Sequence, residues 1–120
     1  MTDTAIRSYK DLLIWQRGMD IVEAIYRLSE GLPTDERYGL SSQLRRAAVS
    51  IPANIAEGHG REATGSFVQH LRIAQGSLKE LETLLMILER IGLGDPVSQL
   101  QSCDELGRML RSMIRALQEK

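Results

Sequence analysis

The most constraining feature of the sequence is an apolar stripe with the period of a coiled-coil helix. Alternating steps of four and three residues connect Phe67, Leu71, Ala74, Leu78, Leu81, Leu85 and Leu88. Side chains at this spacing share one face of an α-helix, whereas a strand would distribute them over both of its faces. The stripe predicts a long helix over about residues 64–91 that packs one face against other helices.

Three other segments carry the same type of one-faced pattern and predict helices over about residues 11–30, 35–58 and 96–118. Their ends carry the usual helix boundary signals. The candidate N-terminal caps are Asp11, Thr34 or Asp35, Thr64 and Asp95, which precedes a proline. Glycines follow each of the first three segments. Four helices therefore account for most of the chain.

Composition and connection length turn these helices into a fold. Hydrophobic residues make up 42% of the 120 residues but aromatic ones only 4%, so the core is aliphatic, which suits helix packing. The links between helices are about three to seven residues long, and short links make consecutive helices antiparallel. We therefore expect an all-α fold, a single four-helix bundle domain over residues 1–120 with up-down-up-down topology.

Pro52 lies inside the second predicted helix. An internal proline removes one backbone donor and crowds the carbonyl of Ala48, at a cost of about 3 kcal/mol. Either the helix stops near Ser50, or it continues with a kink. Because the apolar register continues across the proline, we expect a kinked helix, with Ser50 and Asn54 satisfying backbone groups such as the Ala48 carbonyl.

Apolar residues exceed what one bundle core needs. The segment 78–91 has eight apolar residues in fourteen, more than the three positions in seven that a bundle helix buries. The fourth helix adds a second strip. The surplus predicts self-association through Leu84, Ile87, Ile91, Leu106, Met109 and Met113. The alternative is a broad face that touches two neighbouring helices.

The most distinctive segment is Tyr38–Gly58, which reads YGLSSQLRRAAVSIPANIAEG. Together with Leu13–Gln16 and Ile73–Glu82, it resembles the four-helix bundle proteins related to the intervening-sequence proteins of 23S ribosomal RNA genes. The resemblance covers about residues 9–117. Physically, the motif is rich in small residues that let helices approach closely. We expect Gly76 to lie at such a crossing, against the second helix. A ligand pocket at the kink is the alternative.

The resemblance implies an antiparallel bundle that assembles as a homopentamer. Members of the intervening-sequence type are encoded inside segments that are removed from the ribosomal RNA. A related accessory protein of diversity-generating retroelements forms a basic pentameric barrel that binds nucleic acid and a reverse transcriptase. This chain differs in charge, because its formal net charge is −1. The primary expectation is therefore a non-enzymatic homo-oligomer, a scaffold or adaptor that needs no cofactor.

Nucleic-acid binding is the second expectation. Arg108, Arg111 and Arg115 are spaced by three and four residues and share one helix face, which Lys120 extends. Arg45 and Arg46 add a pair on the second helix. Repeated in an oligomer, these arginines form a basic surface that contacts phosphates. The alternative is an ordinary solvated face, or ion pairs with acids such as Glu105.

The sequence offers little for catalysis. No phosphate-binding glycine loop or nucleophile elbow is present. His59 lies in a polar, glycine-rich segment that ends the second predicted helix. A histidine in such a segment is more often solvated than bound to a metal. Cys103, the single cysteine, falls on an apolar stripe. The N-terminus lacks a signal-peptide pattern and no apolar run can span a membrane, so we expect a cytoplasmic protein with no small-molecule substrate.

Overall fold

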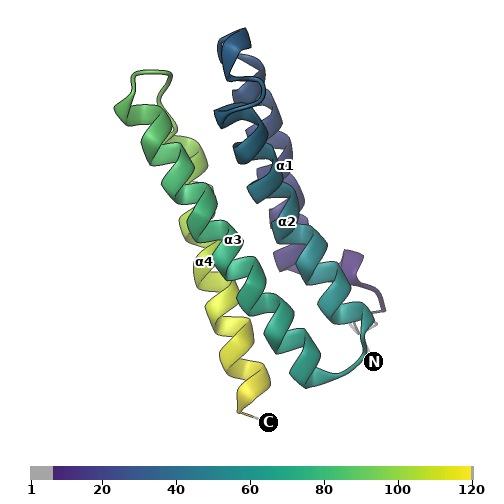
Figure 1. Cartoon of the computed structure of the whole chain (residues 1–120). Coiled ribbons are helices and arrows are strands. Elements are labelled where there is room, and N and C mark those ends of the chain that lie inside the picture. The colour runs from purple at the N-terminus through teal and green to yellow at the C-terminus, as the bar shows by residue number, and fades with distance from the viewer. Residues whose placement is uncertain (1–6, 120) are drawn as a thin grey trace.

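The computed structural model describes residues 7–119 and forms an elongated bundle with extents of 51 × 24 × 22 Å. Its helices are α1 (Leu13–Glu30), α2 (Leu40–Gly60), α3 (Thr64–Arg90) and α4 (Val97–Gln118). Short 3-10 turns, η1 (Tyr9–Asp11) and η2 (Thr34–Glu36), precede α1 and α2. Consecutive helices run in opposite directions (Figure 1). The all-α four-helix prediction is confirmed. Met1–Ile6, where the signal-peptide pattern was sought, and Lys120 lie outside the described residues.

The helices form a closed ring of neighbours. α2 packs against α1 and α3, and α4 packs against α3 and α1. The contact between α2 and α3 is the most extensive and that between α1 and α4 the least. One aliphatic cluster fills the centre, and its fully buried large side chains include Ile25, Leu44, Ile51, Ile55, Leu71, Leu78, Leu81, Leu85, Leu88, Leu106 and Leu110.

Two predicted helix starts are wrong, and so is one predicted cap: Thr64 is the first residue of α3, and Ala63 precedes it without a side-chain cap hydrogen bond. Asp11 does not cap α1, because its carboxylate accepts the backbone N–H groups of Arg7 and Ser8 and so caps the 3-10 turn η1. These two hydrogen bonds lower the pKa of Asp11. The second helix begins at Leu40, five residues after the predicted start, because residues 34–36 form η2 instead. At α4, the Asp95 carboxylate does accept the Val97 N–H, at 3.2 Å.

A single helix runs through Pro52, so the alternative of a break near Ser50 does not hold. The bend itself stays a prediction. Gly18 of α1 makes room for the proline ring, because a Cβ atom at Gly18 would lie 3.4 Å from the Pro52 Cβ. The sequence predicts that the Asn54 side chain satisfies the Ala48 carbonyl. It donates instead to the Ser50 carbonyl, at 2.8 Å.

Gly76 does not lie at a tight crossing, which corrects the prediction made from its position. A Cβ atom built at Gly76 would meet nothing within 4 Å. The tight position is Gly58 of α2, where an added Cβ would lie 2.5 Å from the His70 Cβ. At Gly107 of α4 an added Cβ would make only an ordinary contact with Leu78. Gly58 is thus where α2 and α3 approach most closely next to their connecting turn.

Candidate functional site

The residues predicted to form an oligomer interface divide into three groups, which are buried, exposed and half-buried. Leu106 is fully buried and Leu84 is 7% exposed, and both belong to the core of the bundle. These two side chains are therefore unavailable for an interface. The physical reason is that each helix touches two neighbours, so α3 and α4 bury faces wider than one stripe.

Ile87 and Ile91 are exposed, by 42% and 56% of their surface. The sequence interpretation missed Ile73, which is 46% exposed. It lies 14 and 18 residues before them, close to whole numbers of helical turns, so the three share one face. We call Ile73, Ile87 and Ile91 the α3 isoleucine strip. Its members carry apolar surface that the single chain leaves in water.

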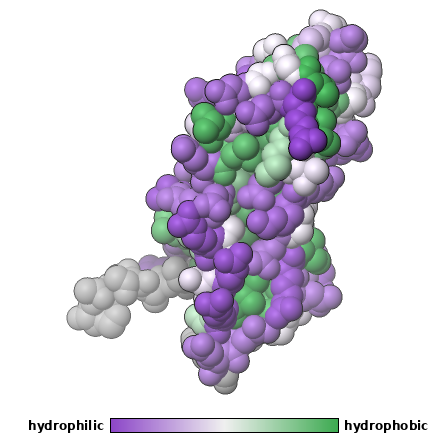
Figure 2. All heavy atoms as spheres, turned by 90° about the vertical axis from the view of Figure 1, so that its left-hand side faces the viewer, coloured by the Kyte–Doolittle hydropathy of each residue, from purple (hydrophilic) through white to green (hydrophobic). Residues whose placement is uncertain are grey.

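Met109 and Met113 lie half-buried at the junction of α4 with α1. With Leu13 and Ile14 they line a shallow groove of about 480 Å³. Leu13 is 53% exposed there. Apolar surface is thus present at two separate places, the α3 isoleucine strip and this groove. On the side of the molecule seen in Figure 2, hydrophobic side chains form separate patches divided by hydrophilic ones.

One of the three predicted α4 arginines already has an ion-pair partner. Arg108 forms an ion pair with Asp104 one turn earlier, which raises the pKa of Arg108 and lowers that of Asp104. Arg111 faces a hollow between α3 and α4 that Arg72 and Lys79 also line. Arg115 is exposed.

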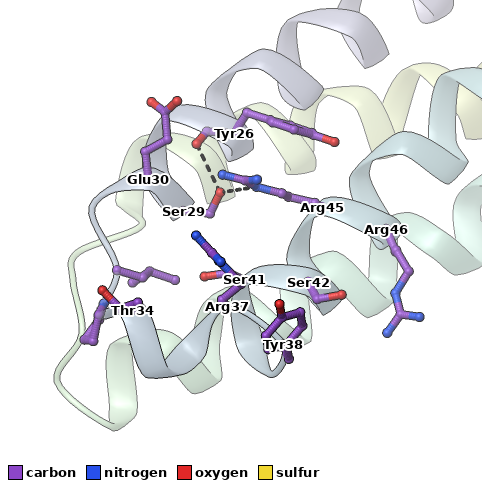
Figure 3. A pocket seen from close by; sticks show the side chains of 12 residues that line it. Tyr26, Ser29, Glu30, Thr34, Arg37, Tyr38, Ser41, Ser42, Arg45 and Arg46 are labelled. Carbon is purple, nitrogen blue, oxygen red and sulfur yellow. Dashed lines mark hydrogen bonds between the residues drawn. The ribbon is translucent and has the colours of Figure 1, made fainter.

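Arg45 and Arg46 lie elsewhere, on α2, which does not pack against α4 within residues 7–119. The structure therefore does not join the two arginine groups in one chain. Both α2 arginines line a pocket of about 520 Å³ at the end of the bundle where α1 connects to α2 (Figure 3). The other charged side chains of its lining are Arg37 and Glu30.

Arg45 is held in place by α1. Its Nε donates to the Ser29 hydroxyl at 2.7 Å, and that hydroxyl donates to the Tyr26 carbonyl at 3.0 Å. The Arg45 guanidinium also lies over the Tyr26 ring, 4.4 Å from its centroid. A guanidinium fixed by a hydrogen bond and by ring stacking is well ordered for recognition of an anion.

Sequence interpretation found two of the residues that line this pocket and missed the others. The one feature of the sequence that could have pointed to this pocket is Ser29, a polar residue that follows Ile21 and Ile25 on the buried stripe of α1. A hydroxyl at such a position needs a partner, which the structure supplies from α2. Arg37 and Tyr38 carried no comparable signal, because they lie in the connection between the helices.

Ser50, Asn54 and Ser77 form a small polar cluster between α2 and α3. The two serine hydroxyls are 2.7 Å apart, and the Asn54 amide donates to the Ser50 hydroxyl at 3.0 Å. The cluster satisfies its own polar groups, as expected of a helix-packing motif.

Comparison with known proteins identifies the relatives of this bundle. Residues 10–114 match the family of 23S rRNA-intervening sequence proteins. The chain belongs to this family. A solved structure of a protein of unknown function from the S23 ribosomal protein family of Bacteroides thetaiotaomicron has the same fold, with a TM-score of 0.79. It is 24% identical, and the match covers 86% of this chain and 96% of that one. No curated protein matches.

Cys103 and His59 are the two reactive side chains that the sequence interpretation weighed for chemistry. Burial raises the pKa of the Cys103 thiol to about 12, so this thiol stays protonated at neutral pH. The His59 ring packs edge-on against Phe67, and Glu57 pairs with Arg61. Over residues 7–119, no group of three metal-ligating side chains comes together, and none of the helices is long and apolar enough to cross a bilayer.

Proposed function

We propose that this intervening-sequence protein is a non-enzymatic, homo-oligomeric scaffold in which subunits associate through the α3 isoleucine strip. The observation that carries the proposal is the exposure of Ile73 and Ile87 on one face of α3 and of Ile91 directly after its last residue. Burying an isoleucine side chain completely is worth about 1.5–3 kcal/mol relative to leaving it in water. The family resemblance supports five as the number of copies.

Gly76 gives the proposal a second support. It lies one turn after Ile73 on α3, is exposed, and leaves open space around its backbone. A glycine inside an exposed helix costs about 1 kcal/mol relative to alanine. A neighbouring subunit that brings a helix close to this point would account for the glycine.

The test is the molar mass in solution, measured by light scattering after gel filtration at micromolar concentration. We expect an oligomer for the natural protein. Changing Ile87 to glutamate puts a charge in the proposed interface and should lower the mass toward that of the monomer, 13.5 kDa. Met86→Glu is the matched control, because Met86 is 50% exposed on a different face of the same helix.

Two results would contradict the proposal. One is a monomeric natural protein. The other is an Ile87→Glu variant that keeps the natural mass while Met86→Glu dissociates, which would place the interface on another face of α3. Circular dichroism checks that both variants keep their helices.

Nucleic-acid binding is the second candidate function. The observation that favours it is the grouping of cations at two hollows, with Arg111, Arg72 and Lys79 at one and three arginines at the other. Multiple copies in an oligomer would repeat these cations around the assembly.

This candidate predicts that structured RNA or single-stranded DNA binds and that binding weakens steeply as salt rises, because phosphate contacts release counterions. We expect Arg111→Glu to weaken binding more than Arg108→Glu, because Arg108 is already paired with Asp104. Fluorescence anisotropy at several salt concentrations measures both effects. An absence of binding at low salt would remove this candidate.

A further inference from the structure

The pocket at the α1–α2 end has a net cationic lining. Its lining includes three arginines, Arg37, Arg45 and Arg46, and one carboxylate, that of Glu30. Among residues 7–119, neither the Arg37 side chain nor the Arg46 side chain has a hydrogen-bonding or ion-pair partner. In Figure 3 the Arg45 guanidinium lies at Ser29 and the Arg37 guanidinium is drawn next to Ser41, whereas Arg46 points away along α2. Arg37 and Arg45 thus leave most of their N–H donors available at one place.

Ser41 adds a hydroxyl to that place. Its surface is only 7% exposed, yet its side chain forms no hydrogen bond within the described chain, and it lines the pocket. No buried side-chain oxygen among the described residues lacks a hydrogen-bond partner, so the unpaired Ser41 hydroxyl is reached from the pocket, where a ligand can contact it. Because the Ser29 hydroxyl is already bonded to Arg45, we expect Ser41 to be the serine that contacts a ligand.

Tyr38 completes the lining with an aromatic ring. It is 87% exposed, the most exposed of the large hydrophobic side chains in the described residues. An aromatic ring in water beside a cationic hollow offers a face on which a nucleobase can stack. The pocket volume of about 520 Å³ falls within the range of about 300–1,000 Å³ that is usual for small-molecule sites.

We propose that this pocket binds a nucleotide, with the phosphate between Arg37 and Arg45 and the base against Tyr38. The Ser41 hydroxyl donates to a phosphate oxygen, and Arg45 offers its terminal N–H groups while Nε stays on Ser29. The nucleotide is either free or one unit of a single strand. The site is independent of the oligomer proposal, and it supplies a contact point for the nucleic-acid candidate.

The experiment is titration calorimetry of the full chain with adenosine 5′-monophosphate, adenosine, inorganic phosphate and a single-stranded oligoadenylate of eight nucleotides. We expect the monophosphate to bind and adenosine to bind far more weakly. Arg37→Gln should weaken monophosphate binding by about tenfold or more, the usual effect of losing a hydrogen bond between charged groups. Ser41→Ala should weaken it as well.

Two further variants separate the parts of the site. Tyr38→Ala should weaken the monophosphate by about fivefold or more and leave inorganic phosphate unchanged, because only the base stacks. Arg61→Gln is the control for net charge, since Arg61 follows the opposite end of α2 and should leave binding unchanged. Thermal unfolding checks that each variant folds.

The outcomes decide both the site and its source of ligand. Binding of the oligoadenylate but not of the monophosphate, with the same loss in Arg37→Gln, assigns the site to a strand. The proposal is overturned if none of the phosphate compounds binds at millimolar concentration, or if Arg61→Gln weakens binding as much as Arg37→Gln. The pocket proposal is also overturned if the oligoadenylate binds the natural protein and all pocket variants equally. In that case the protein would still be a candidate for nucleic-acid binding at another site.

Discussion

Replacing Leu106 with alanine is expected to lower the free energy of unfolding by about 2–5 kcal/mol, the usual effect of removing a buried leucine side chain. Leu106 is fully buried among aliphatic side chains, so the shorter residue leaves a cavity that the surrounding helices fill only partly. Ile87→Ala should cost less than about 1 kcal/mol in the subunit, because Ile87 already contacts water. Urea unfolding followed by circular dichroism measures both.

This pair of variants also separates a core role from an interface role. Unfolding of an assembled protein depends on protein concentration, whereas a core defect lowers stability at every concentration. We therefore expect the Leu106→Ala loss to be the same at two protein concentrations tenfold apart. If Leu106→Ala lowered the free energy of unfolding by less than about 1 kcal/mol, or only at high protein concentration, Leu106 would belong to an interface and not to the core.

Gly58→Ala is expected to destabilise the bundle by about 1–3 kcal/mol, the range of an overpacked core. The new Cβ would lie 2.5 Å from the His70 Cβ and 3.3 Å from a Phe67 ring carbon, so α2 and α3 must move apart. Alanine gains about 1 kcal/mol in helix propensity over glycine, but the clash with His70 outweighs this gain. For a domain of 120 residues, each kcal/mol shifts the melting temperature by about 4 °C.

Gly65→Ala is the matched control. Gly65 is exposed in the first turn of α3, and an added Cβ there meets nothing within 4 Å. The melting temperature of this variant should stay the same or rise, because alanine replaces a helical glycine without a clash. If Gly58→Ala melted at or above the natural temperature, α2 and α3 would be free to separate at this end.

The fold was accessible from the sequence because its determinants are local. The apolar spacing of residues 67–88 can be recognised without knowing any partner, since helical geometry alone puts those side chains on one face. The Asp104–Arg108 pair is local in the same sense, being four residues apart on a helix. Continuity of α2 through Pro52 also followed from the unbroken register.

The start of α2 was not accessible in this way. Thr34 and Asp35 are residue types that favour helix starts, but they lie inside the short turn η2, which begins without a side-chain cap hydrogen bond. Its connection to Leu40 passes through Gly39, where the backbone leaves the helical region. Which of two acceptable starts continues as a long helix depends on where Leu40 meets the core, a tertiary contact.

The sequence by itself determined the four helices, their antiparallel order and the aliphatic core, because these follow from periodicity and short links. The tertiary structure decided which apolar residues remain outside, since a leucine such as Leu84 and an isoleucine such as Ile87 differ only in what packs over them. It also decided that Gly58, and not Gly76, is the close contact. The nucleotide pocket exists only because Ser29 and Arg45, sixteen residues apart on different helices, meet in space.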